Sequence, residues 1–337
     1  MSLSDTDRVF SDAHTSATEG RIAWDAPKSL WTFAHMAGGI AALILFPSWG
    51  GVAAFLTLAA ITLCAGHSVG MHRLLIHRSF TAPKSLERTL VWLGTLVGMA
   101  GPFGMIRAHD MRDWHQRQVA CPPHPSHGAG WLRDAWWQMH CRFALTHPPR
   151  FEIEPEIAGD PIYQWVERHW MAQQLIPATL LFALGGIGWV LWGISLRIAV
   201  SLIGHWAVGH AAHKGGHQGW EIRGLPVQGY NLRGLGFLTF GESFHGNHHA
   251  FPHSAQLGVE RGQLDPGFWL ILGLERLGLA WDVKGPHSQD PREGLARVAP
   301  ASMEPGTGGW PEQSKGSYPV CARVNTQAPK TQIFQNQ

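Results

Sequence analysis

Charged residues are scarce in this chain, and cysteines are few. Asp, Glu, Lys and Arg make up 15% of the 337 residues, against about 25% in an average soluble domain. The formal net charge of +2 gives no basic surface for nucleic acid. The spacing of the four cysteines indicates neither a disulfide framework nor a CxxC zinc pair. These absences argue against a DNA-binding protein, a disulfide scaffold and a disordered chain, so no nucleic-acid partner is expected.

Histidine is abundant instead. The sequence contains 21 His, nearly as many as its 26 Lys and Arg or its 24 Asp and Glu, together with 17 Trp. The hydrophobic fraction of 45% is ordinary for a globular protein. The few charges must therefore be unevenly distributed along the chain.

Two long stretches carry almost no charge. Residues 29–71 have none, which is too long for one bilayer crossing of about 20 residues but suits two. Pro47 and the residues after it break this stretch, so we expect a helix pair at about 31–70 with Trp49 at the membrane interface. A second pair is expected at about 171–213, interrupted only by Arg197. Buried helices of a soluble protein are the alternative, but neither stretch has an amphipathic stripe.

These pairs predict an all-α integral membrane protein with four transmembrane helices in two hairpins and a helical cap that holds the polar segments. A third uncharged run, 89–106, contains five Gly or Pro residues, and as a span it would separate the histidine motifs described below. We expect it not to cross. Basic residues flank the first hairpin, whereas the hairpin turns carry only Arg197. The positive-inside rule then makes the termini and the cap cytoplasmic, in the inner (plasma) membrane if the cell is bacterial.

The chain divides into an N-terminal cytoplasmic segment (1–30), a membrane domain (31–285) and a tail (286–337). Asp265 and Pro266 predict a helix start that continues to Leu279 without spanning the membrane. Beyond Asp290 the sequence is rich in Pro, Gly, Gln and Ser, so we expect disorder there.

Histidines gather just outside the predicted membrane helices. On a helix, His248 and His249 both lie near His245, but they diverge by about 100° and so suit two different metal ions. His72 and His77 are about 140° apart on an ideal helix, so they would converge only on two ions or across a helix end. Imidazole suits Fe, Zn, Cu and Ni rather than Mg or Ca. Three groups together predict metal binding: His72 and His77; His109 and His115; His245, His248 and His249.

The motifs HRLLIHRSF (72–80) and GESFHGNHHAFP (241–252) resemble the first and third histidine boxes, HxxxxH and HxxHH, of membrane acyl-lipid and acyl-CoA desaturases of the stearoyl-CoA type. The resemblance covers about residues 30–285. It implies two Fe ions, O2 as co-substrate, and His213 as a further ligand in a segment where Gly209 stands in place of the family's Asn. The ligands implied or predicted are His72, His77, His109, His115, His213, His245, His248 and His249.

The second box departs from the family pattern. Arg112 and Asp113 occupy the positions where HxxHH requires two histidines after His109. Either Asp113 supplies an oxygen ligand, or His115 is brought in by a local irregularity, or one metal has fewer protein ligands.

Residues beside the boxes have supporting roles in this interpretation. Glu242, Asn247 and Asp110 are expected to orient ligand imidazoles. Arg73 and Arg78, with Lys84 and Arg88, are candidates to attract an anionic substrate head group, or are simply topology residues. The remaining histidines singled out are expected to be structural or to support the ligands: His67, His124, His205, His210, His217 and His253.

The resemblance implies an O2-dependent desaturase that places a cis double bond, of the Δ9 type, in a saturated acyl-CoA or acyl-lipid chain within membrane lipids. It also implies an external electron donor, namely a ferredoxin, a rubredoxin or a cytochrome b5-type protein. A di-iron hydroxylase of the same superfamily is one alternative. A non-catalytic membrane metal or haem protein is another, but it needs opposed histidines inside the helices, where only His35 and His205 are candidates.

Overall fold

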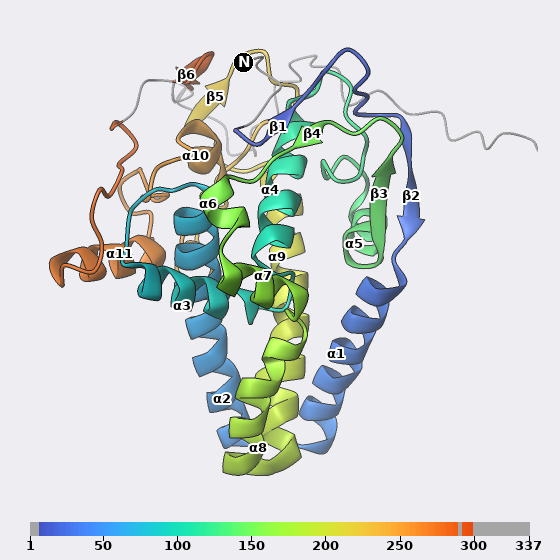
Figure 1. Ribbon diagram of the computed structural model, residues 1–337, viewed down its shortest axis with the longest axis vertical. Helices are drawn as coiled ribbons and strands as arrows, with labels where there is room; N and C mark the ends of the chain where they lie inside the picture. The colour runs from blue at the N-terminus through green and yellow to red at the C-terminus, as the bar shows by residue number, and fades with distance from the viewer. Residues whose placement is uncertain (1–6, 289–291, 299–337) are drawn as a thin grey trace, which may run out of the picture.

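A narrow helical stalk carries a broader cap in the computed structural model, which describes residues 7–288 and 292–298. The stalk contains α1 (Ala26–Leu45), α2 (Trp49–Ala60), α8 (Leu175–Val190) and α9 (Arg197–Ala212) (Figure 1). The π-helix η1 (Ile61–Ile76) continues α2 into the cap, and η3 (Leu191–Leu196) joins α8 to α9. The helices of the cap are α3 (Lys84–Thr95), α4 (Pro102–Arg117), α5 (Trp131–His140), α6 (Pro155–Ala158), α7 (Pro161–Arg168), α10 (His245–Ala250) and α11 (Pro266–Arg276), and η2 (Ala172–Gln174) precedes α8.

Among the described residues, three helices are long and apolar enough to cross a membrane: Ala26–Leu45, Trp49–Ile76 and Ala172–Ala212. The first two are separated where Ser48 caps α2, its side chain accepting a hydrogen bond from the Gly51 amide at 3.0 Å. The region 89–106 is divided between α3 and α4 and is not among these helices, as expected.

The third long helix is not straight. Gly186 has φ 68° and ψ −163°, outside the helical region. Leu181 packs against Ile194 in one apolar cluster, although residues thirteen apart on a straight helix would be about 20 Å apart. The segments before and after Gly186 therefore fold back on each other.

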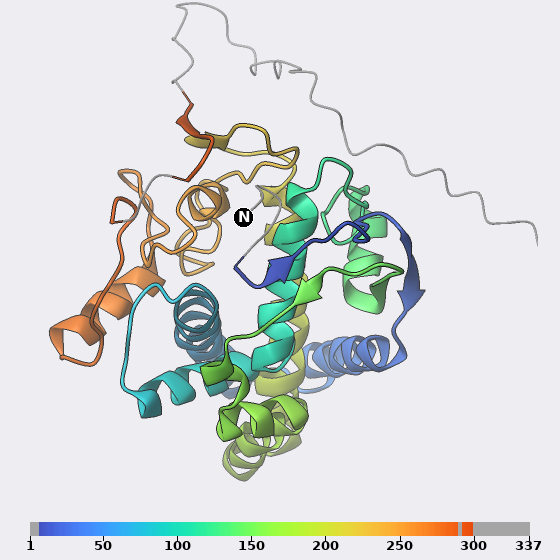
Figure 2. The ribbon, with the colours of Figure 1, turned by 45° about the horizontal axis from the view of Figure 1, so that its top comes forward.

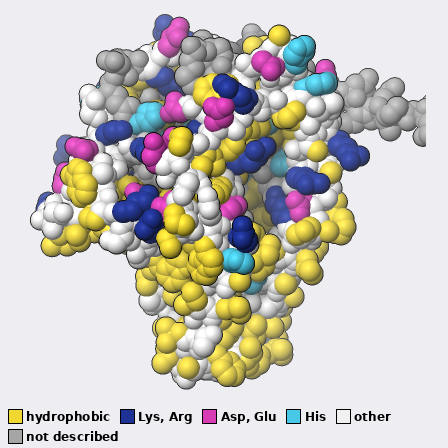
Figure 3. Space-filling model, in the orientation of Figure 1, with side chains coloured by type: hydrophobic (Ala, Val, Ile, Leu, Met, Phe, Trp, Pro, Cys, Tyr) yellow, Lys and Arg dark blue, Asp and Glu magenta, His cyan; other side chains and the backbone are white. Residues whose placement is uncertain are grey.

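On the face shown in Figure 3, apolar side chains cover the stalk and charged side chains gather on the cap. Leu45, Trp49 and Leu184 are more than 60% exposed, which is the pattern of a surface that faces lipid rather than water.

The cap also contains short strands, so the all-α expectation is wrong in detail. β1 (Val9–Phe10) pairs with β4 (Arg150–Phe151), and β2 (Gly20–Trp24) pairs with β3 (Cys141–Leu145), both antiparallel. Within the expected disordered tail, β6 (Leu295–Arg297) pairs with β5 (Trp220–Ile222). That expectation is therefore wrong for 292–298, while most of the tail lies outside the described residues.

The cap is organised around η1. One buried apolar cluster joins Val69 and Leu74 of η1 to Leu90 of α3 and Ile271 of α11. A second joins Met71 and its neighbours to α4 and α7. Asp265 caps α11 by accepting a hydrogen bond from the Phe268 amide at 3.0 Å, which confirms the predicted helix start. This packing fixes the end of η1, which carries the first histidine motif.

Candidate metal centre

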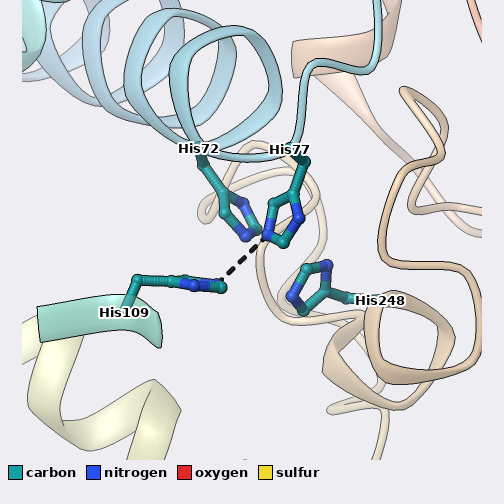
Figure 4. Close-up of side chains that lie close together, drawn as sticks. All are labelled: His72, His77, His109 and His248. Carbon is teal, nitrogen blue, oxygen red and sulfur yellow. Dashed lines mark hydrogen bonds between the residues drawn. The ribbon is translucent and has the colours of Figure 1, made fainter. Parts of the chain in front are cut away.

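Four histidines from three elements converge at the end of η1. His72 and His77 come from this end, His109 from α4 and His248 from α10 (Figure 4). Each offers a ring nitrogen within 4.8 Å of the others. The Nε2 atoms of His77 and His109 are 3.2 Å apart. We call this group the first cluster.

The end of η1 explains why residues five apart reach one cluster. The His77 amide donates to the His72 carbonyl at 3.1 Å, which is the i→i+5 pattern of a π-helix rather than the i→i+4 pattern of an α-helix. This wider turn places both rings on one side, with their centroids 4.9 Å apart. Of the two arrangements expected for this pair, the structure therefore has convergence across a helix end.

Three further histidines form the second cluster. His213 caps the C-terminus of α9, and His245 and His249 come from α10. The Nε2 atom of His245 lies 2.9 Å from that of His213 and 3.0 Å from that of His249. Because His248 points to the first cluster and its neighbour to the second, the short helix α10 joins both, as its spacing predicts. Figure 2 shows α10 and α4 beside the cap end of the α2–η1 helix.

Carboxylates hold two ligand candidates in place. His72 Nδ1 lies 2.6 Å from Glu242 Oε2, and His109 Nδ1 lies 2.9 Å from Asp110 Oδ1. An ionised carboxylate only accepts, so each Nδ1 carries the proton and each Nε2 keeps a lone pair. Glu242 and Asp110 thus have the positions expected of groups that orient ligands.

Burial favours the neutral form of five imidazoles in the two clusters. Desolvation, followed by neighbouring positive charge, lowers the pKa of His77, His213, His245 and His248 well below 6.5. Burial lowers the pKa of His249 to about 3. Neutral imidazole is the form that binds metal, so the clusters are ready to do so at physiological pH.

His115 and Asp113 are not placed as ligands. His115 donates from Nδ1 to the Met111 carbonyl at 2.6 Å and packs beside Phe143, away from both clusters. Asp113 Oδ1 lies 3.9 Å from His249 Nδ1, on the side of the ring away from the Nε2 that faces the cluster. The regular helix α4 carries both residues away from His109, so the irregularity that would bring His115 in does not occur.

Two other expectations need correction. Asn247 contacts no ligand ring; its side-chain amide donates to the Leu257 carbonyl at 2.7 Å and accepts from Asn231 at 2.8 Å, which anchors α10. Arg73 is only 1% exposed and donates to Asp265 at 2.8 Å, so it is unavailable to a substrate head group. Arg78 remains 48% exposed.

The sequence does not predict a hydrogen-bonded group of residues that lies beside the second cluster. Asp134 Oδ2 accepts from His127 Nδ1 at 2.9 Å, from His210 Nδ1 at 2.8 Å and from Trp206 Nε1 at 2.8 Å. Although burial alone raises the pKa of Asp134, these donors hold it well below its usual range. No spacing rule connects these residues, because three separate segments supply them. We call them the Asp134 hub.

Replacing Glu242 by Gln is expected to lower the affinity of the first cluster for metal by about 10–100-fold, because the amide holds the His72 imidazole less firmly and adds no negative charge. Titration of the metal-free protein with ferrous ion against a competing chelator measures this. The control is Glu260→Gln, since Glu260 pairs with His217 at 2.8 Å away from both clusters. Equal affinities in the two variants would contradict the expectation.

A stalk that can cross a membrane, below two neighbouring polyhistidine clusters, indicates a membrane protein whose histidines could hold metal. Residues 47–272 match the model of the fatty acid desaturase family. The chain belongs to this family, and it is an oxidoreductase that desaturates fatty acyl chains.

The curated relatives share most of the chain. An sn-1 stearoyl-lipid 9-desaturase of Anabaena variabilis is 35% identical over 70% of this chain and 85% of its own length. The protein of the same name from Synechocystis sp. is 35% identical over 76% of this chain and 79% of its own. An acyl-CoA 5-desaturase of Anemone leveillei is 31% identical over 71% and 73%.

Proposed function

We propose that the protein desaturates a membrane-embedded acyl chain, placing a cis Δ9 double bond at a di-iron centre held by the two histidine clusters. The main support for this proposal is that α10 contributes to both clusters: His248 belongs to the first, and His245 and His249 belong to the second. Two iron ions bound there would supply the activation of O2 needed to remove hydrogen from an unactivated methylene pair.

The residues present fit such a centre. At His213 the Nδ1 proton is donated to the Gln228 carbonyl at 3.2 Å, so the Nε2 lone pair points at His245, 2.9 Å away. His245 Nε2 lies within 3.0 Å of the Nε2 atoms of both His213 and His249, so three ring nitrogens that can act as ligands meet at one point. An all-imidazole donor set suits iron better than Mg or Ca, and it resists oxidation better than thiolates.

The surrounding residues fix the orientation of these imidazoles and exclude water from them. Glu242 fixes His72, and Asp110 fixes His109 while itself accepting from Arg8 at 3.0 Å. His248 is 5% exposed, so bulk water has little access to the first cluster. Exclusion of water protects a strong oxidant from side reactions.

The substrate we propose is an acyl-lipid. Three of the four basic side chains expected to attract an anionic substrate head group pair with carboxylates of the protein: Arg73 with Asp265 at 2.8 Å, Lys84 with Glu87 at 2.7 Å and Arg88 with Asp160 at 3.1 Å. The relatives from Anabaena variabilis and Synechocystis sp. are named stearoyl-lipid 9-desaturases. A lipid reaches the clusters from the membrane, along the side where the stalk meets the cap.

In this proposal the break at Gly186 divides Ala172–Ala212 into two crossings, which makes four spans in all. Positive-inside charge then makes the cap, the clusters and both termini cytoplasmic. The two electrons that each turnover requires come from an external donor of the ferredoxin, rubredoxin or cytochrome b5 type.

Expression in a host that lacks the activity, followed by mass spectrometry of derivatised fatty acids, tests this function. We expect a new Δ9 monounsaturated acid that appears first in membrane lipids. A hydroxylated acid, or no product from an iron-loaded protein with a competent donor, would overturn the proposal. Appearance of the product first in the acyl-CoA pool would overturn the lipid substrate alone.

A further inference from the structure

The second cluster is short of one imidazole. It has three histidines where the first has four, and no residue of the second box reaches it. Arg112 stands where the box would offer a histidine, and a guanidinium has no lone pair with which to bind a metal. A fourth imidazole for this cluster would therefore have to come from outside the boxes.

His127 lies beside this cluster. Its ring is parallel to that of His213, with centroids 5.7 Å apart. Ring pairs inside the two clusters are 4.6–5.8 Å apart, so His127 is as close to His213 as some ligand candidates are to each other. We propose that His127 Nε2 is the fourth imidazole ligand of the second metal, an inference that rests on the proposed di-iron function.

The Asp134 hub prepares His127 for this role. Asp134 Oδ2 accepts the Nδ1 proton of His127, so the lone pair is on Nε2. That Nε2 has no hydrogen-bond partner, and the side chain is 1% exposed. A carboxylate beside Nδ1, with Nε2 on the opposite side of the ring, is also the arrangement of His72 with Glu242 and of His109 with Asp110.

Gly209 leaves room for this nitrogen. A Cβ at position 209 would lie 3.2 Å from His127 Nε2 and 3.6 Å from its Cε1. The imidazole therefore occupies the space next to α9 that a side chain at 209 would need. Gly209 lies one turn of α9 before His213, so the space beside Gly209 adjoins the second cluster.

The ligand atoms of His127, Asp134 and His210 also lie within 4.8 Å of one another, but in this proposal they form a hydrogen-bond network and not a third metal site. Trp206 donates its indole N–H to the same carboxylate oxygen that His127 and His210 use, at 2.8 Å. An indole N–H is only a donor, and three donors on one oxygen form a hydrogen-bond network. The hub therefore orients His127 instead of competing for metal.

Anaerobic titration of the metal-free full-length protein with ferrous ion against a chelator tests the assignment. We expect two equivalents in the wild type. His127→Ala should weaken the second equivalent by tenfold or more and leave the first unchanged, and added imidazole should restore it. The control is His124→Ala, another buried histidine of the same loop, bonded to Gln138 at 3.0 Å.

Unchanged binding of both equivalents by His127→Ala would overturn the assignment, and so would an equal loss in His124→Ala. A third equivalent that both His127→Ala and His210→Ala abolish would show an independent site and would also overturn it. Failure of the proposed function looks different: the wild type itself would then bind no iron pair and make no alkene.

Discussion

His248→Ala is expected to abolish the unsaturated product and to remove about one of two iron ions per chain. His248 is the member of α10 that reaches the first cluster, with its ring centroid 4.6 Å from those of both His72 and His77. No neighbouring side chain can replace it, because His245 and His249 face the second cluster. Fatty acid analysis of the expressing host and iron analysis of the purified protein check both effects.

The metal-free His248→Ala protein should still fold. Burying neutral imidazoles without partners destabilises the metal-free state, so removing one does not weaken it further. We expect a melting temperature within a few degrees of the metal-free wild type. His147→Ala, a change at a half-exposed residue far from the clusters, is the control and should keep both product and iron. A His248→Ala protein that makes product at the wild-type rate would contradict the assignment of the first cluster.

The features that the sequence predicts well are those set by local spacing. An uncharged run of about forty residues predicts two membrane helices, and Pro47 with Ser48 indicates where the chain turns between them. The separations within His245, His248 and His249 follow from helical geometry alone. These predictions depend on residues close in sequence, and the structure has the helix break between Leu45 and Trp49 and the two directions of the α10 histidines.

The features that were missed depend on contacts between distant segments. His127, Asp134 and His210 come from a loop, α5 and α9, and nothing in their spacing links them. The convergence of His72 and His77 depends on a π-helical turn, which an ideal α-helix does not describe. Asn247 was placed beside a ligand because it lies between two histidines, yet its amide points to Leu257.

Arg73 shows most clearly why adjacency in sequence misleads. It follows His72 directly, and its charge suggested a surface role. The packing of α11 on η1 buries it instead, next to Gly241, whose missing Cβ would lie 2.6 Å from Arg73 Nη2. Gly241 has φ 96°, a conformation that glycine adopts without strain. Only the folded cap shows that this arginine connects the first and third boxes.

Arg73→Ala is therefore expected to destabilise the cap by about 3–5 kcal/mol, because Asp265 would keep a buried charge without its partner. The guanidinium also donates to the Ala255 carbonyl at 2.8 Å and to the Phe240 carbonyl at 3.0 Å. Phe240 and Ala255 flank the third box, so loss of the guanidinium should also displace α10. Fluorescence-detected size-exclusion after heating measures the loss of folded protein.

A second change separates the buried charge from the lost packing. Arg73→Lys keeps a positive charge beside Asp265 but makes fewer hydrogen bonds than the guanidinium, so it should be more stable than Arg73→Ala and less stable than the wild type. Arg78→Ala is the matched control from the same motif; because Arg78 is exposed, that variant should fold normally. A folded Arg73→Ala protein with unchanged melting and a raised KM would instead restore the head-group role, since a residue that binds substrate at the surface affects KM without supporting the cap.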